Sequence, residues 1–391
     1  MHELSLSDRL AGALWGMLAA DALAAPSHWF YGGHGQVRRL LGGSIAGYVQ
    51  PLSEMHAFPE SIMAVSSTSG AGRGTSDGDL IGSVINHGKK QYWAPGSGYH
   101  YHCTLRAGES TLEGHMVRLM MRTLSASAAE FDADRFQRAY VEFMTRPGAH
   151  NDAYASSYHR IFFANRAAGK PLAACPGSDE AMFGHNTDTI DGLIAPTVVL
   201  LAQLVHHHKK DARDAAVRSL RTQRTSRLGE EYIEDLATLL SAVMIEGISA
   251  VEAAEEAARR RYAVQTALKF GIRAKGEVKA PVVSCGVEPS WQALLMLLAK
   301  HGDDAEACLL ANANAGGENV HRGILLGAVL GARVGASALP SWLKEGLVER
   351  AVIEEEIRAF VEVVIGAHEA AQRQRVTGHG GTMHRETELR L

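Results

Sequence analysis

Apolar residues recur at helical spacing along most of the 391-residue chain. In the first segment, Leu10, Leu14 and Met17 fall on one helical face, and Ser5 and Asp8 precede them with the spacing of a capping box. Alternating β-branched runs are almost absent. The pattern therefore predicts an all-α fold of about a dozen helices. After the first helix, they are expected at residues 111–127, 132–143, 152–168, 190–209, 230–245, 249–270, 289–301, 303–314, 320–336 and 352–372.

Glycines repeat every four residues in two of these segments. Gly12 and Gly16 lie in the first helix, and four more glycines are spaced in the same way within residues 320–336. Glycine destabilises a helix relative to alanine, so this repetition indicates helices that cross closely. Arg322 and Arg333 argue against a membrane span for the second segment.

Two regions lack the helical pattern. Residues 32–80 are rich in Gly and Ser, and a structureless segment of that length inside a compact protein is usually functional. Residues 372–391 also lack apolar periodicity and are expected to form a mobile tail. No charged linker divides the rest, which predicts a single domain over residues 1–371.

The composition narrows the class of protein. Lys and Arg number 39 against 43 Asp and Glu, a net charge of −4, so there is no broad electrostatic footprint for nucleic acid or an anionic membrane. No run of about 18 uninterrupted apolar residues and no signal-peptide pattern is visible, so neither a membrane span nor export is expected. The four cysteines do not pair at CxxC spacing, which favours reduced thiols and a cytoplasmic location.

The first candidate site follows the N-terminal helix, within residues 12–33. Asp21 is the only carboxylate in this apolar segment, which breaks at Pro26 into His28, Trp29, Phe30 and Tyr31. A buried carboxylate needs a partner. Either Asp21 accepts hydrogen bonds from amides of the following loop, or Asp21 and His28 face a pocket with an aromatic wall.

Two further polar clusters lie in the first third of the chain. Residues 74–88 hold Asp77 and Asp79 beside Thr75 and Ser76, a set that suits a hard cation but equally suits a helix N-cap, the simpler interpretation. Residues 99–115 hold two histidines two positions apart, followed by a carboxylate. Such histidines could bind a transition metal, although surface or hydrogen-bonded histidines are commoner. The residues of this second cluster are His100, His102 and Glu109.

Two more clusters open apolar helices. Acidic residues are favoured at a helix N-terminus on dipole grounds alone, and anions also bind there. The cluster before the helix at 190–209 comprises His185, Asn186, Asp188 and Asp191. The cluster after Gly316 and Gly317 comprises Glu318, Asn319, His321 and Arg322. Because the helix that follows this last cluster is otherwise so apolar, we favour a functional role for it.

Together these segments resemble the ADP-ribosylglycohydrolase family. DRLAGALWGMLAADALAAP at 8–26 is similar to its first motif, a Gly-stepped helix leading to G-D-A-L-G-x-P. GGENVHRGILLGAVLGARVGA at 316–336 is similar to its last motif, G-G-D-x-D-T before a Gly- and Ala-stepped helix, and T-S-D and H-N-T-D segments lie between. The resemblance covers about residues 5–370. It implies a compact multi-helix orthogonal bundle that binds two Mg²⁺ ions and hydrolyses the bond joining ADP-ribose to a side chain or small molecule.

The chain departs from the family's motifs at several acidic positions. The T-D-D-T run becomes residues 75–79, Thr-Ser-Asp-Gly-Asp, and the D-x-D-T run becomes residues 318–321, Glu-Asn-Val-His. The Glu that commonly follows the first motif falls at His28. Magnesium ligands are therefore depleted, and new candidates for rebuilding the site are Asp79, His28, His321 and Glu109.

The resemblance assigns roles to individual residues. Cleavage at the anomeric carbon passes through an oxocarbenium-like state, which needs carboxylates to activate water, and hard cations can orient the diol. Proton transfer near neutral pH falls to His28 or His321. The catalytic candidates are Asp21, His28, Asp77 and Glu318. The metal candidates are Asp77, Asp79, Asp188, Glu318 and His321. The substrate-binding candidates are Trp29, Tyr31, Glu109, Asn186, Asn319 and Arg322.

Three functions remain open from the sequence. The leading hypothesis is a Mg²⁺-dependent hydrolase of an ADP-ribosylated protein or small molecule, or of a related ribosyl glycoside. The second is a non-catalytic ADP-ribose or nucleotide-binding protein. The third is a hydrolase with a transition metal ligated by His100, His102, His185 and His321. The leading hypothesis requires that Asp21, Asp77, Asp188 and Glu318 converge at one cleft.

Overall fold

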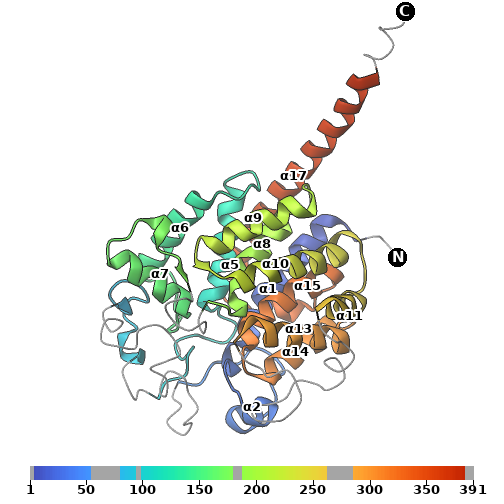
Figure 1. Cartoon of the computed structure of the whole chain (residues 1–391). Helices are drawn as coiled ribbons and strands as arrows, with labels where there is room; N and C mark the ends of the chain where they lie inside the picture. The colour runs from blue at the N-terminus through green and yellow to red at the C-terminus, as the bar shows by residue number, and fades with distance from the viewer. Residues whose placement is uncertain (1–3, 54–79, 94–97, 179–186, 262–284, 384–391) are drawn as a thin grey trace, which may run out of the picture.

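Two glycine-stepped helices, α1 (Leu6–Ala24) and α15 (Asn319–Val334), pack along each other at the centre of the fold (Figure 1). The computed structural model describes residues 4–53, 80–93, 98–178, 187–261 and 285–383. In these ranges the strands are β1 (Gly177–Ser178) and β2 (Arg224–Thr225), which pair in parallel. The prediction of an all-α fold is confirmed.

The remaining helices surround this central pair in several layers. In chain order the elements are η1 (Ala25–Ser27), α2 (Gly33–Leu41), η2 (Lys90–Trp93), α5 (Leu112–Ser125), α6 (Ala133–Thr145), α7 (Ser157–Ala167), η3 (Leu172–Ala174), η5 (Ile190–Leu193), α8 (Ile194–Gln203), α9 (Lys209–Arg221), α10 (Arg227–Leu240), the π-helix η6 (Ser241–Ile245), α11 (Ala250–Arg261), α13 (Val287–His301), α14 (Ala305–Ala315), α16 (Ser341–Glu345) and α17 (Arg350–Met383).

The predicted close crossing of glycine-stepped helices is the contact between α1 and α15. A Cβ added at Gly16 would overlap the carbonyl oxygen of Gly327, and one added at Gly331 would overlap that of Gly12. The two backbones thus touch at two levels, where any side chain would force them apart. We call this contact, at Gly12, Gly16, Gly327 and Gly331, the glycine seam.

By length and composition, residues 6–27 could cross a membrane. This is the one such helix among the described residues, and nearly all of it is buried inside the protein. Burial of that kind is typical of the core helix of a globular protein, and α15, α5 and α14 contact α1.

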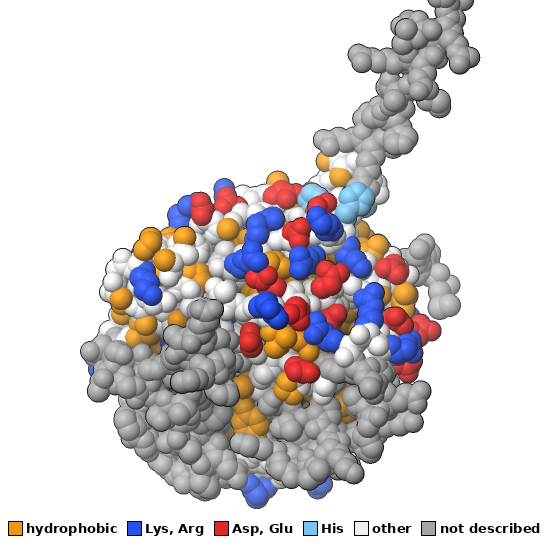
Figure 2. Space-filling model, viewed as in Figure 1, with side chains coloured by type: hydrophobic (Ala, Val, Ile, Leu, Met, Phe, Trp, Pro, Cys, Tyr) orange, Lys and Arg blue, Asp and Glu red, His pale blue; other side chains and the backbone are white. Residues whose placement is uncertain are grey.

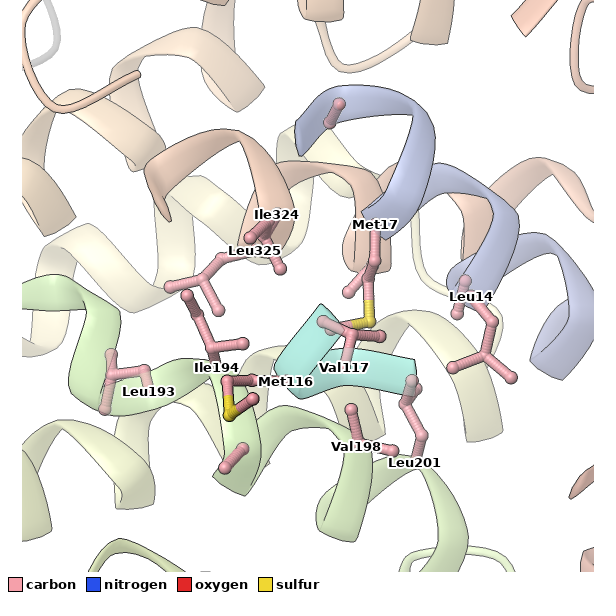
Figure 3. Close-up of a cluster of buried hydrophobic side chains, with 14 of the residues drawn as sticks. Leu14, Met17, Met116, Val117, Leu193, Ile194, Val198, Leu201, Ile324 and Leu325 are labelled. Atoms are coloured by element: carbon pink, nitrogen blue, oxygen red, sulfur yellow. The ribbon is translucent and has the colours of Figure 1, made fainter. Parts of the chain in front are cut away.

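Beneath the seam, a hydrophobic core joins α1 and α15 to α5 and α8 (Figure 3). Met17 of α1 lies beside Val117 of α5, and Ile324 and Leu325 of α15 lie near Ile194 at the start of α8. All of these side chains are at most 1% exposed. Because this core holds both helices of the seam, it also fixes the position of the loops at their ends.

Residues 32–80 were expected to lack regular structure, and this is wrong for the beginning of the segment. Residues 33–41 form α2, whose Val37 is buried and whose end is marked by Gly42 in the left-handed conformation. The helix has no side-chain N-cap and begins at a glycine, so the sequence carries none of the usual start signals. Residues 54–79 lie outside the described residues.

Two helix boundaries also differ from expectation. The helix expected from residue 152 begins at Ser157, because the Asp152 side chain and the carbonyls of residues 152–154 bond to other parts of the chain. The expected boundary between domain and tail at residue 371 lies inside α17, which continues to Met383 and projects from the body (Figure 1).

The face drawn in Figure 2 carries acidic and basic side chains interspersed over α9, α10 and α11. Several are ion-paired, including Arg213 with Glu234 and Arg221 with Glu230. No extended basic patch is present on this face among the described residues, in keeping with the near-neutral net charge.

Candidate active site

The chain segments that follow α1 and precede α15 are bound to each other through the backbone. The Trp29 amide donates to the Gly317 carbonyl at 2.7 Å, and the Gly317 amide donates to the Phe30 carbonyl at 3.1 Å. Trp29 adopts a φ of 62°, a strained conformation for a tryptophan. This pairing brings two residues 289 positions apart, Trp29 and Glu318, into direct contact.

Glu318 is the centre of the site. Its carboxylate accepts hydrogen bonds from the Trp29 indole and from His321 Nδ1, and His28 Nε2 lies 3.9 Å from its Oε2 atom. Glu318, His28 and His321 are 1%, 0% and 2% exposed. The sequence predicted these three residues as candidates, and the structure brings all three together.

The three groups shift one another's ionisation. Burial favours the neutral acid, but His321 and His28 outweigh it and hold the pKa of Glu318 well below its usual range. Burial likewise opposes charge on His321, but Glu318 raises the pKa of His321 to about 9. Burial lowers the pKa of His28 to about 3. The expectation that His28 or His321 titrates near neutral pH is therefore wrong, since Glu318 and burial move the two pKa values in opposite directions.

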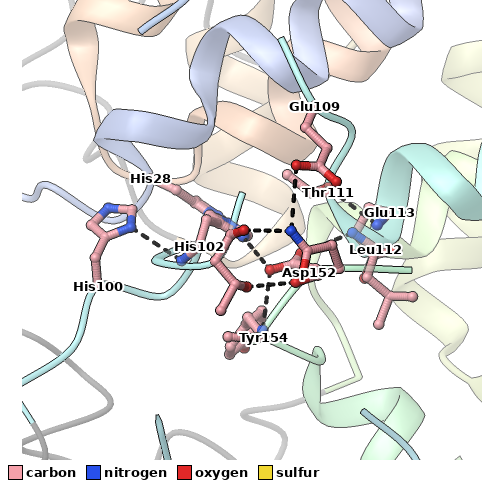
Figure 4. A network of polar contacts seen from close by, with 12 residues as sticks. His28, His100, His102, Glu109, Thr111, Leu112, Glu113, Asp152 and Tyr154 are labelled. Carbon is pink, nitrogen blue, oxygen red and sulfur yellow. Dashed lines mark hydrogen bonds and ion pairs between the residues drawn. The ribbon is translucent and has the colours of Figure 1, made fainter. Parts of the chain in front are cut away.

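A chain of hydrogen bonds supports His28 from behind (Figure 4). His28 Nδ1 lies 2.7 Å from His102 Nε2, and His102 Nδ1 lies 2.9 Å from the Asp152 carboxylate. Asp152 also accepts from the amides of Leu112 at 2.9 Å and Tyr154 at 3.1 Å. The orientation of His28 is thus fixed by a buried carboxylate through a second imidazole.

Asp21 binds the residue that caps α5, Thr111. It accepts from the amide of Thr111 at 2.8 Å and from its hydroxyl at 2.6 Å, while Thr111 caps the first turn of α5. Burial raises the pKa of Asp21 to about 7, against the lowering effect of these two hydrogen bonds. Asp21 therefore bonds to a backbone amide, but to one in a distant segment instead of the loop that follows it.

Of a second buried polar cluster, around Glu113 and Arg224, the sequence had indicated only Asp191. Glu113 on α5 accepts from the hydroxyls of Ser156 at 2.8 Å and Tyr158 at 2.7 Å, and lies 3.2 Å from His159 Nε2. Nearby, Arg224 donates to Asp191 at 2.8 Å and lies over the ring of Tyr158. No local signal distinguishes Glu113, because an acidic residue in a first helical turn is ordinary.

Two of the predicted substrate-binding residues hold the loop before α15 together. Asn319 donates to Ser27 at 2.7 Å, and Arg322 donates to Asn312 at 2.8 Å and to the Gly316 carbonyl at 3.2 Å. Both are fully buried. Their contacts position Glu318 and tie α15 to η1 and α14.

Other predicted residues bond away from Glu318. Asp188 accepts from the Ser226 hydroxyl, and no described contact joins Asp188 to Glu318. Glu109 accepts from the Arg106 amide at 2.8 Å and from Asn151 at 3.4 Å. The sequence predicted that Asp21 and Asp188 converge on Glu318. The described contacts do not confirm this, because Asp188 bonds to Ser226 and Asp21 bonds to Thr111. Asp77, Asp79, His185 and Asn186 lie outside the described residues.

Trp29 is largely enclosed by other aromatic rings. Its ring lies 4.3 Å from those of His28 and Tyr101 and 4.6 Å from that of Tyr154, by ring centroids. Trp29 is 8% exposed, whereas Tyr31 is half-buried. Trp29 therefore orients Glu318, and Tyr31 is the more accessible ring of the two.

The donor atoms of His28, Glu318 and His321 all lie within 4.8 Å of one another, close enough to hold a metal ion. Among the described residues a second such group comprises Glu130, His206 and His207, of which Glu130 is exposed and His206 is buried. One carboxylate and two imidazoles are a poor match for Mg²⁺, which prefers six oxygen ligands. The described residues therefore do not fit the magnesium site that the resemblance implied.

Comparisons with known proteins agree with this arrangement of motifs. The family model described as ADP-ribosylglycohydrolase matches residues 2–374. A solved structure titled "ADP-ribosylglycohydrolase-related protein complex" shares the fold at a TM-score of 0.54 and 21% identity, covering 92% of this chain and 99% of its own. No curated protein matches. The chain, matched by the family model over nearly its whole length, belongs to the ADP-ribosylglycohydrolase family.

Proposed function

We propose that this protein hydrolyses the glycosidic bond between an ADP-ribosyl, or related ribosyl, group and a protein side chain or small molecule. Family membership indicates a glycosidic hydrolase that acts on ADP-ribose-related substrates. The observation that carries the finer proposal is the buried carboxylate of Glu318, held at the head of α15 by groups that follow α1.

The ionisation of Glu318 decides which role it takes. Because its pKa is held well below the usual range, Glu318 is a carboxylate at neutral pH and cannot donate a proton to the leaving group. A carboxylate in this position can accept a proton from the attacking water or stabilise the positive charge that develops on the ribose. The Trp29 indole fixes its orientation for either role.

Asp21 is the group whose ionisation changes near neutral pH, yet it bonds to Thr111. We therefore assign Asp21 to positioning α5 and its Glu113 instead of direct proton transfer. Which metal the reaction requires depends on which ion His28, Glu318 and His321 bind. Members of the family generally bind divalent metals, and the one carboxylate and two imidazoles of Glu318, His28 and His321 are a poor match for Mg²⁺.

We also propose a cellular location. All four cysteines are unpaired, which supports a reducing compartment, and we propose the cytoplasm. The substrate class is an ADP-ribosylated protein or a small ADP-ribosyl compound.

The proposal is tested by following release of ADP-ribose from ADP-ribosylated arginine and from an ADP-ribosylated protein. Wild type should release it, and Glu318→Gln should slow release by about 10²-fold or more, the usual contribution of such a group. Glu109→Gln is the matched control, since Glu109 contacts Arg106 and Asn151 instead. Equal loss in both variants would contradict the assignment.

A non-catalytic binding protein gives a different result. In that case wild type binds free ADP-ribose in calorimetry but releases none from either substrate. Glu318→Gln would then change the affinity without any turnover to lose.

A further inference from the structure

The nitrogen and oxygen donors at His28, Glu318 and His321 indicate which kind of metal ion the site binds, which family membership alone does not. We propose that His28, Glu318 and His321 bind a divalent transition-metal ion such as Zn²⁺, Co²⁺ or Fe²⁺ in preference to Mg²⁺. The inference rests on the proposed function for its catalytic meaning, but the binding itself is measurable without turnover.

For a neutral His102, the contact with Asp152 sets the tautomers of His102 and His28. Asp152 already accepts from two backbone amides and faces His102 Nδ1 at 2.9 Å, so Nδ1 of a neutral His102 carries the proton. His102 Nε2 is then an acceptor. His28 Nδ1, 2.7 Å away, must therefore donate to it.

This leaves a lone pair on His28 Nε2, directed at an anion. Nε2 is fully buried and makes no hydrogen bond within the described part of the chain. It lies 3.9 Å from Glu318 Oε2. Two buried acceptors that face each other without a hydrogen atom between them are unfavourable, and a cation between them removes the conflict.

The spacing suits a single ion. Zn²⁺ bonds to imidazole nitrogen and carboxylate oxygen at about 2.0–2.2 Å. A separation of 3.9 Å is less than twice that length, so one ion can contact both atoms. His321 directs Nδ1 at the other oxygen of Glu318, and an ion there would replace the shared proton.

The type of donor decides which ion is preferred. Two imidazoles and one carboxylate form the ligand set of catalytic zinc and non-haem iron sites, whereas Mg²⁺ requires oxygen ligands. A ligating histidine is usually held by a carboxylate through its other nitrogen, and here Asp152 acts through His102.

The surface group provides an internal control. Glu130 lies 2.8 Å from His207 Nε2 and 3.5 Å from His206 Nε2, and its side chain is 59% exposed. It has the same donor types, but only His206 of its three side chains is buried. In the double variant Glu130→Gln/His207→Gln this group is removed without touching the core.

The experiment titrates the metal-free double variant, as the full chain, with Zn²⁺, Co²⁺ and Mg²⁺ by calorimetry. We expect one Zn²⁺ per chain, bound at least about 100-fold more tightly than Mg²⁺, and visible absorption bands from bound Co²⁺. Adding His321→Gln should weaken Zn²⁺ binding by more than about 100-fold. Loss of Zn²⁺ binding in the double variant itself, or equal affinity for Mg²⁺, would overturn the proposal.

Anomalous scattering from Zn²⁺-soaked crystals of the double variant locates the ion even if His321→Gln does not fold. An ion bonded to His28, Glu318 and His321 supports the inference, and an ion elsewhere refutes it. The two proposals fail separately. Zn²⁺ bound here without ADP-ribose release refutes only the glycohydrolase, whereas Mg²⁺-dependent release without Zn²⁺ or Co²⁺ binding refutes only the transition-metal site.

Discussion

The same two helices, α1 and α15, carry two very different regions. Along their length they meet at the glycine seam, where backbone touches backbone and the surroundings are apolar. At one end of the pair lies a cluster of buried ionisable groups, with Glu318 between Trp29, His28 and His321. The seam tolerates no added atom, while the polar end holds charges that cost stability unless they are paired.

The difference shows what each region contributes. The seam contributes rigidity, because close packing at two levels leaves one relative position for the helices. The polar end uses that rigidity to hold Glu318 and His28 in a fixed relation despite their 290-residue separation. Four predictions test this division, in order of decreasing effect.

The largest effect is expected at the seam. Gly327→Ala places a Cβ against the carbonyl group of Gly16 and the amide of Met17, which are backbone atoms that cannot rotate away. We expect a loss of about 3 kcal/mol or more in the free energy of unfolding, measured in urea. Gly366→Ala is the control, since Gly366 lies in α17 with open space around its Cα, and should gain up to about 1 kcal/mol. Equal effects at both glycines would contradict the close contact.

The second effect is a pH dependence from Asp21. Its pKa is raised from 3.8 to about 7 on folding, so between these values the folded state binds more protons and stability falls as pH rises. From pH 5.5 to 8 the wild type should lose about 2 kcal/mol relative to Asp21→Asn, which mimics the protonated acid. Parallel stability curves for the two proteins would show that Asp21 is ionised throughout this range.

The third effect is local to the start of α5. Thr111→Val removes the cap and the hydroxyl that donates to Asp21, and should cost about 1–2 kcal/mol. In a double-mutant cycle with Asp21→Asn the two changes should be non-additive, because the Thr111 hydroxyl donates to the Asp21 side chain. Additive changes in unfolding free energy would show that the Thr111 cap stabilises α5 independently of Asp21.

The smallest effect is expected at the surface. Arg122 is 40% exposed and pairs with Glu356 at 2.7 Å. Arg122→Ala should change the unfolding free energy by less than about 1 kcal/mol, and less still in high salt. A loss comparable to that of Gly327→Ala would mean that this ion pair matters as much as the seam.

Regularly spaced features were readable from the sequence. The four-residue glycine repeat predicted the seam because only glycine permits such an approach, and apolar periodicity predicted most helices. The short α2 was missed because it lacks a cap and begins at a glycine in a glycine-rich stretch.

The partners of the polar groups could not be read in the same way. His102 was a candidate, but its link to Asp152 depends on a loop 50 positions away, within a segment expected to be helical. Glu113 and Arg224 look like ordinary helix-end residues until folding brings Tyr158 and Asp191 to them. Glu318 was identified through its motif, whereas its contacts with Trp29 and His28 exist only in the folded chain.

The most direct test of the central claim, that the polar end of α1 and α15 is the reactive centre, is a crystal structure with ADP-ribose bound. We expect the anomeric carbon of the distal ribose within about 3–4 Å of the Glu318 carboxylate or a water that it holds. A separate cavity of about 440 Å³ between α5 and α6, lined in part by Arg118, Arg122 and Arg146, offers positive charge elsewhere. ADP-ribose found there, with no density near Glu318, would contradict the account.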